Sequence, residues 1–339
     1  MGKNYILNIG VSDTSLQYNA WDKARNDVTL TCINNGYTEI KIHYKIGSVI
    51  NKLRNSINLI CHIINLNLKK TGNILIQYPG YKCNINKSVK IIRRLTRHKI
   101  SILIHDLDSY RSNGILNTSE KEILECADTI YAHTPAMKRL IENHTNNNCE
   151  IKILNLFDYY GKIDEIDKDA AIKNFIKSHS SVVFAGNLSK SLFLKKIKNW
   201  INNYPIILYG NKIELQNPNL IYYGRFSPDD INNIAGDWGL VWDGDSIETC
   251  DGQLGKYLKI NASHKASLYL ACGKPIIVWQ QSGIAPYIIN NKLGIAIKSI
   301  EEIPTIIQNI SPAELSVLKN NAINESLLIR KGFHLKNIL

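Results

Sequence analysis

Several features that define common protein classes are missing from this chain of 339 residues. Its seven cysteines are an odd number and none forms a C-x-x-C pair, which favours reduced thiols and no zinc site. No apolar run approaches the roughly 20 residues that span a bilayer. The N-terminus reads as a strand and not as a signal peptide. We therefore expect a cytoplasmic protein, and contact with the inner face of the membrane stays open.

Common nucleotide and nucleic-acid signatures are absent too. The chain has no Walker loop, no G-x-G-x-x-G turn, no zinc finger, no arginine-rich arm and no aromatic RNA-binding motif. The net charge is +12, and the basic residues are scattered along the chain, with modest clusters at Lys87–Lys99 and Lys190–Lys198. An anionic membrane surface, an anionic small substrate or a simply solvated surface each fits this charge. Nucleic acid would fit it as well, but we do not expect a nucleic-acid partner.

Strand and helix signals alternate from end to end. Hydrophobic content of 44% and charged content of 21% indicate a globular protein, and the length suits two domains. Alternation implies parallel sheets with right-handed crossovers. The fold class expected is therefore α/β, with two Rossmann-like doubly wound domains facing a central cleft. The expected strands are Tyr5–Ile9, Thr38–Tyr44, Asn73–Gln77, Ile100–Ile104, Thr129–Ala132 and Ile151–Leu154, then Ser181–Ala185, Pro205–Tyr209, Leu220–Tyr223, Gly239–Trp242, Ile276–Trp279 and Gly294–Ile297.

The domain linker is expected in the polar segment Asp158–Lys168. This gives an N-terminal domain at 1–160, a C-terminal domain at 161–310, and a helical segment at 311–339 that packs back on the first domain. The expected helices are Ser15–Asn34, Val49–Asn65, Lys87–His98, Glu120–Cys126, Leu192–Trp200 and Pro228–Ala235, one capped by Thr134 with Pro135 as its first residue, and one from Ser311 onward.

Glycines follow three strands of the second series. Gly186 lets the backbone turn tightly or approach a ligand, and polar side chains come directly after it. Three such strand ends in one domain favour a nucleotide site over ordinary turns. The candidate contacts are Gly186, Asn187, Ser189, Lys190, Gly210 and Tyr223.

The stretch Gly239–Trp279 reads as strand, acidic glycine-rich loop, helix and strand. Its helix opens with His264 and Lys265 after good capping residues. A helix N-terminus favours an anion such as a diphosphate. We expect Lys265 to neutralise a leaving diphosphate and His264 to bond it; the alternative is a solvated first helical turn.

The acidic loop contains Asp243-Gly244-Asp245, which looks like the D-x-D metal motif of metal-dependent sugar transferases. Two carboxylates can hold Mg²⁺ against a diphosphate. However, the motif lies deep in a second α/β domain, which argues against a metal. We expect Asp243 and Asp245 to bond sugar hydroxyls or to order the loop, without a metal ion.

Candidate acceptor residues follow strands of the first domain. Asp106 or Asp108 is suited to act as a general base on an acceptor hydroxyl, and His105 to bond a sugar hydroxyl. A capping Asp and a structural His are the alternative. The loop after the first strand adds Ser12, Asp13 and Ser15 as acceptor-binding candidates.

Longer motifs resemble a known group. W-D-G-D-S-I-E-T-C, L-G-K-Y-L-K-I-N-A-S-H-K-A-S-L-Y-L, I-H-D-L-D-S-Y-R and F-A-G-N-L-S-K resemble bacterial β-1,6-galactofuranosyltransferases. They are similar also to the accessory glucosyltransferases that extend O-linked GlcNAc on serine-rich repeat adhesins. The resemblance implies a GT-B fold, a UDP-sugar held mainly by the second domain, an acceptor held by the first, no metal or further cofactor, and a homo-oligomer, dimer or tetramer. It also implies UDP contacts at Asn187, Lys190, Tyr223 and Lys265.

One departure concerns stereochemistry. Many retaining GT-B enzymes carry E-x7-E, and here Ile260 and Leu268 stand at those positions. An inverting displacement with an Asp base is compatible. The expected activity is transfer of glucose, GlcNAc, galactose or galactofuranose from a UDP-sugar to a glycan on an adhesin or a lipid carrier. A non-catalytic sugar-nucleotide-binding subunit is the alternative.

Overall fold

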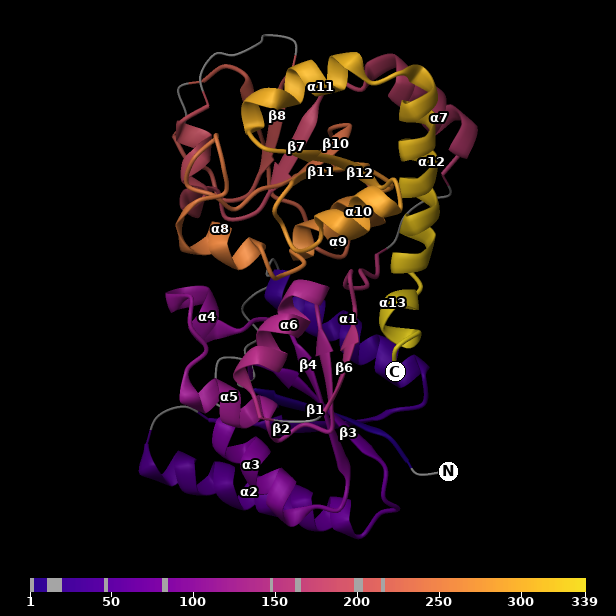
Figure 1. The fold of residues 1–339 in the computed structure, drawn as a ribbon. Helices are drawn as coiled ribbons and strands as arrows, with labels where there is room; N and C mark the ends of the chain where they lie inside the picture. Colours follow the sequence, from indigo (N-terminus) through magenta and orange to yellow (C-terminus); the bar gives the residue numbers. More distant parts are fainter. Residues whose placement is uncertain are drawn as a thin grey trace. The chain divides into compact units, whose positions relative to one another are not determined.

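The computed structural model describes residues 3–10, 20–45, 48–80, 85–146, 149–161, 166–197, 204–214 and 217–339. These residues form two compact units. Unit 1 comprises 3–10, 25–154 and 338–339, and unit 2 comprises 20–24 and 155–337. In each unit a parallel sheet is flanked by helices (Figure 1), so the α/β class with two doubly wound domains is confirmed.

The sheet of unit 1 has the strand order β2-β1-β3-β4-β5-β6. Its central strands are apolar on both faces, as strands covered by helices on both sides must be; Ile74 and Ile102 are fully buried. The strands are β1 (Tyr5–Gly10), β2 (Thr38–His43), β3 (Asn73–Tyr78), β4 (Lys99–Ile104), β5 (Thr129–Ala132) and β6 (Glu150–Ile153). The helices are α1 (Ala20–Asn34), α2 (Val49–Asn67), α3 (Asn86–Leu95), α4 (Asp108–Asn113), α5 (Thr118–Leu124) and α6 (Pro135–His144).

The sheet of unit 2 has the strand order β12-β11-β10-β7-β8-β9. Its strands are β7 (Val182–Ala185), β8 (Ile206–Tyr209), β9 (Leu220–Gly224), β10 (Trp238–Val241), β11 (Ile276–Trp279) and β12 (Gly294–Ile297). The helices are α7 (Lys168–Ser178), α8 (Gly252–Leu258), α9 (His264–Ala271), α10 (Ala285–Asn290), α11 (Ile303–Asn309), α12 (Pro312–Ile329) and α13 (Phe333–Lys336), with 3-10 turns η1 (Leu188–Lys190), η2 (Leu192–Lys195) and η3 (Ile300–Glu302).

Local capping explains where two predicted helices begin. The Thr134 hydroxyl accepts the Met137 N–H at 3.1 Å, with Pro135 as the first residue of α6. Ser311 caps α12 in the same way. Helix α12 lies in unit 2 and packs against α7 and α9, while residues 338–339 belong to unit 1.

The helix predicted at Pro228–Ala235 is absent, since this segment forms turns. Its Asp and Asn side chains compete for backbone hydrogen bonds and weaken a short helix, and a turn already forms where Asp230 N–H donates to the Ser227 carbonyl. The helix predicted at Leu192–Trp200 begins as the 3-10 turn η2, and 198–200 lie outside the described residues. Among the described helices, none is long and apolar enough to cross a membrane.

Candidate active site

The order of the strands in unit 2 has a reversal point of the kind at which open α/β sheets bind ligands. In unit 2, β7 leads to β8 on one side, while β10 lies on the other side of β7. In open α/β sheets, ligands bind outside the carboxyl ends of the strands at such a reversal point. The residues at this point are Gly186, after β7, and Trp242-Asp243, after β10. Both belong to segments that the sequence singles out.

The glycines at the carboxyl ends of β7, β8 and β9 lie in a row. Gly186 N–H donates to the Tyr209 carbonyl at 3.0 Å, and Gly210 N–H donates to the Gly224 carbonyl at 2.8 Å. A Cβ on Gly210 would stand 2.2 Å from the Gly186 carbonyl oxygen. Gly210 is therefore required by the close approach of two backbones.

Lys265 connects the carboxyl ends of β7 and β10. Its ammonium forms an ion pair with the Asp243 carboxylate and lies 5.1 Å from the ring centroid of Phe184. Its side chain passes close to Gly186, where an added Cβ would stand 3.2 Å from Lys265 Cε. Both partners of the pair are largely buried, with 18% of Lys265 and 25% of Asp243 exposed. A cation is thus fixed at the reversal point, where the sequence predicts the diphosphate.

Tyr269 fixes the helix that carries Lys265. Its hydroxyl accepts the Ala185 N–H at 2.8 Å, and its ring lies against Gly239, where a Cβ would stand 2.2 Å from the ring. One side chain of α9 thereby ties the helix to both β7 and β10. Sequence reasoning missed this residue, although Gly239 in an otherwise apolar strand signals a close approach.

His264 and the start of α9 are more enclosed than expected. The His264 ring packs 5.3 Å from Tyr159 and 5.6 Å from Phe157, measured between centroids. The Ser263 hydroxyl accepts the Lys265 N–H at 3.4 Å, a long capping bond. A diphosphate at this helix start would contact the Lys265 side chain and the Lys265 backbone N–H, whose hydrogen bond to Ser263 is weak.

The two acids of D-G-D face different partners. Asp243 pairs with Lys265, whereas Asp245 lies at the start of α8, where a Cβ on Gly252 would stand 2.4 Å from Asp245 Oδ2. Asp251 orders the loop, since its Oδ1 accepts the Asp245 N–H at 2.9 Å. Within the described residues, no group of three His, Cys, Asp or Glu side chains is placed to hold a metal ion.

The remaining candidates of unit 2 lie on the surface around this point. Asn187, Ser189 and Lys190 are exposed, and the Ser189 hydroxyl donates to Asn187 Oδ1 at 2.7 Å. Tyr223 is 55% exposed, with its ring 6.0 Å from that of Tyr209. An exposed aromatic ring beside the glycine row offers a surface on which a base can stack.

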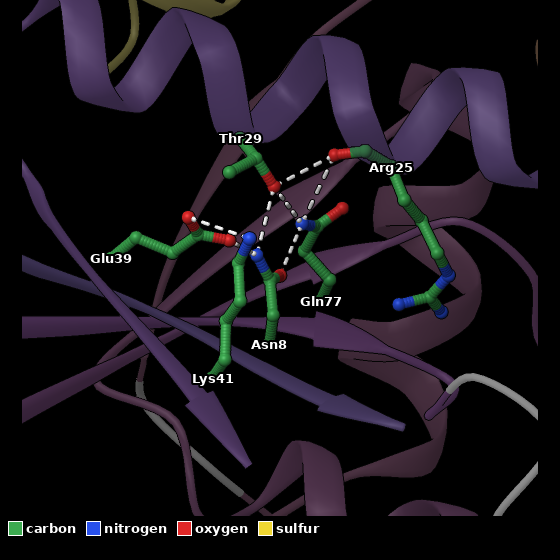
Figure 2. A network of polar contacts seen from close by, with 6 residues as sticks. All are labelled: Asn8, Arg25, Thr29, Glu39, Lys41 and Gln77. Carbon is green, nitrogen blue, oxygen red and sulfur yellow. Dashed lines mark hydrogen bonds and ion pairs between the residues drawn. The ribbon is translucent and has the colours of Figure 1, made fainter. Parts of the chain in front are cut away.

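In unit 1, His105 is part of a buried polar network. His105 Nε2–H donates to Gln77 Oε1 at 2.7 Å, and the Gln77 amide donates to Asn8 Oδ1 at 2.8 Å and Thr29 Oγ1 at 3.0 Å. Figure 2 shows the part of this network around Gln77, Asn8 and Thr29, on β3, β1 and α1, with Glu39 of β2 accepting from Asn8 at 2.8 Å. The network fixes the ring of His105. Sequence reasoning missed Gln77, whose signal is a polar residue in a buried strand.

Asp106 also has a fixed partner. Arg111 donates to Asp106 Oδ2 at 2.9 Å from α4. Desolvation raises the pKa of the neighbouring Asp108 carboxyl above its usual value, against the opposing effect of Arg111 and Arg25. A raised pKa makes Asp108 a stronger base, while Asp106 stays a candidate by its position after β4. Ser12, Asp13 and Ser15 lie outside the described residues.

Known proteins share this architecture. The chain superposes on sucrose-phosphate synthase (tll1590) from Thermosynechococcus elongatus with a TM-score of 0.63 and 12% identity, covering 99% of this chain and 97% of that chain. It matches HepE from Anabaena in complex with UDP with a TM-score of 0.56 and 11% identity, covering 96% and 97%. In sequence, it is 30% identical to the beta-1,6-galactofuranosyltransferase WbbI of Escherichia coli (strain K12), covering 86% of this chain and 85% of the relative.

The fold and the relatives define a glycosyltransferase of the GT-B class. The chain belongs to the glucosyltransferase 3-like family, whose N-terminal domain model matches residues 3–157 and whose C-terminal domain model matches 182–339. Both groups that the sequence motifs resemble are thereby confirmed as relatives.

Proposed function

We propose that this glycosyltransferase transfers a hexose from a UDP-sugar to a hydroxyl of a glycan. The Lys265 ammonium would neutralise the negative charge that develops on the leaving UDP. The observation that carries the proposal is the position of the Lys265 ammonium between the carboxyl ends of β7 and β10. UDP is bound in the HepE structure with the same fold. The relationship to a galactofuranosyltransferase and a glucosyltransferase family does not favour the alternative of a non-catalytic subunit.

On the donor side, the diphosphate would lie along Gly186 and the turn that follows it. Lys190 and Lys265 would neutralise it, and Tyr223 would stack on the uracil ring. Asp243 would hold Lys265 in place before the donor arrives. Pre-positioned charge at the leaving group is a large catalytic term, because it costs no reorganisation during the reaction.

On the acceptor side, residues of unit 1 would activate the attacking hydroxyl. Asp106, held by Arg111, or Asp108, whose pKa is raised, would accept its proton. His105 would act mainly by position, because Gln77 already engages its Nε2. The acceptor is a glycan on a serine-rich adhesin or on a lipid carrier.

Two further expectations belong to the proposal. The enzyme works without a metal ion, because Lys265 supplies the charge that Mg²⁺ would supply, so EDTA leaves the rate unchanged. It also assembles as a homo-oligomer, which light scattering behind size exclusion would reveal. A rate that collapses with EDTA and returns with Mn²⁺ would refute the first expectation, and a monomeric mass the second.

The central test is calorimetry of UDP with Lys265→Ala. We expect UDP affinity to fall at least about tenfold, since a charge-assisted contact of about 1.5–3 kcal/mol is lost, and UDP-sugar hydrolysis to fall with it. Lys173→Ala, an exposed change on α7, is the matched control. Unchanged UDP affinity in Lys265→Ala would contradict the proposed role of Lys265 in binding UDP. Hydrolysis across a panel of UDP-sugars identifies the sugar.

A further inference from the structure

The positive charge of the chain is concentrated in one stretch of unit 1. Residues 40–105, here called the acid-free segment, contain 13 of the 41 Lys and Arg residues and none of the 29 Asp and Glu residues. The rest of the chain therefore holds 28 bases against 29 acids and is nearly neutral. The net charge of +12 is thus a property of the region around α2 and α3, and a general surface bias does not account for it.

Helix α2, in the middle of this segment, carries apolar side chains on two sides. Leu59, Ile63 and Leu66 are buried in the core. A second set, here called the apolar stripe, is exposed by 48–83% and consists of Ile50, Leu53, Ile57, Ile60, Ile64 and Leu68. The spacing of three and four residues places the stripe along one side of the helix. Exposed apolar patches of this kind mark interaction surfaces.

Helix α3 lies beside α2 and also exposes apolar side chains. Asn67 at the end of α2 donates to the Leu95 carbonyl at the end of α3 at 2.6 Å, so the two helix ends adjoin. Figure 1 shows α2 and α3 running together along unit 1. Ile91 and Leu95 are exposed on α3, and the helical spacing places Lys87 and Arg94 on the same side.

Three partners could cover such a surface, and charge separates them. A second copy would bring two acid-free segments together with no carboxylate from either to compensate, which costs repulsion. A nucleic acid would satisfy the bases but would leave the apolar stripe in water. A membrane rich in anionic lipid satisfies both, because its headgroups attract Lys and Arg and its acyl boundary accepts apolar side chains.

We propose that α2 and α3 dock on an anionic membrane surface. The apolar stripe inserts at the level of the headgroups, and Lys87 and Arg94 contact lipid phosphates, whereas Lys90 and Arg93 of α3 pair with Glu122 and Asp128. Helix α2 would lie in the membrane plane, as an amphipathic basic helix does. The proposal stands independently of the transfer reaction; if the proposed function holds, it favours the lipid-linked acceptor over the adhesin.

The experiment is sedimentation of the full chain with vesicles of phosphatidylcholine alone or mixed with phosphatidylglycerol. We expect binding only to the mixed vesicles, weakening as salt rises. Ile57→Gln with Ile64→Gln should reduce binding roughly tenfold or more, since two isoleucines that would insert into the membrane are lost. Lys87→Glu with Arg94→Glu should reduce it by at least roughly fivefold for each base.

Matched controls keep the result specific. Val317→Gln on α12, 41% exposed, and Lys173→Glu on α7 should leave vesicle binding unchanged. UDP affinity and the unfolding midpoint of every variant should match the wild type, which separates this test from the test of the donor site. The proposal is overturned if the wild type ignores mixed vesicles at low salt. It is overturned too if Ile57→Gln with Ile64→Gln dissociates a dimer without changing vesicle binding. The same holds if duplex DNA binds through Lys87 and Arg94 while Ile57→Gln with Ile64→Gln still binds vesicles normally.

Discussion

Lys265 and Asp243 form an ion pair across the reversal point of the second sheet, with Lys265 at the start of α9 and Asp243 in the loop after β10. The pair is mostly shielded from water, so its electrostatic coupling is stronger than that of a surface pair. A diphosphate arriving at Lys265 would therefore compete with Asp243 for the same ammonium. This competition gives Asp243 a positioning role that a sugar contact alone would not.

Asp243→Asn should separate binding from turnover. UDP affinity should rise several-fold because the competing charge is gone, while kcat should fall roughly tenfold because Lys265 loses the partner that sets its position. Calorimetry and donor hydrolysis measure the two effects. Adding Asp243→Asn to Lys265→Ala should change little, since residues that act as a unit are not additive. A loss of UDP affinity in Asp243→Asn equal to that in Lys265→Ala would contradict this role.

Tyr269→Phe tests the link between α9 and β7. The change leaves the buried Ala185 N–H without its acceptor, and a buried unsatisfied donor costs about 1–3 kcal/mol of unfolding free energy. Urea unfolding should report that loss, and turnover should fall because Lys265 is less well placed. Tyr222→Phe, whose exposed hydroxyl donates to the Gly210 carbonyl at 3.0 Å, should cost far less. Equal losses in the two variants would argue against an anchoring role for Tyr269.

Gly210→Ala tests the close approach behind the donor site. The new Cβ would clash with the Gly186 carbonyl, so the turn after β7 must move, at a cost of about 1–3 kcal/mol. UDP affinity should fall with it. Gly36→Ala is the control, because its φ of +83° strains the backbone of unit 1 with nothing within 4 Å of the new Cβ. It should lose stability but keep its affinity for UDP; normal UDP affinity in Gly210→Ala would show that the turn is not part of the site.

His133 predicts a loss of stability in acid. Burial lowers the pKa of His133 to about 4 from its usual 6.5, and its Nε2–H donates to the Ile104 carbonyl at 2.8 Å. Because the folded state binds fewer protons, stability is full above pH 6.5 and is lost as pH falls toward 4. At about 1.4 kcal/mol per pKa unit, up to about 3 kcal/mol depends on this group. His133→Gln should flatten this part of the pH profile of unfolding; an unchanged slope would assign the loss to other groups.

The strands were predictable because apolar runs bounded by polar turns have few alternatives in an α/β chain. The prediction of a helix at Pro228–Ala235 was wrong because the apolar spacing of this segment suits a helix, while its Asp and Asn side chains favour turns. Helix α8 was not foreseen inside the acidic loop. Its start depends on the folding of 243–251 around Asp251, a contact that spacing along the chain does not reveal.

The sequence by itself determined two parallel α/β domains, the glycines at the ends of three neighbouring strands, and a lysine at the start of the helix that precedes β11. Strands, helices and turns follow from hydrophobic periodicity and turn residues over short stretches of sequence, so they can be predicted without the tertiary structure. Only the tertiary structure decided that Lys265 meets Asp243, that Gln77 engages His105, and that the apolar stripe of α2 stays exposed. These relationships depend on which strand lies beside which and on which side of a helix the core covers, and sequence spacing fixes neither.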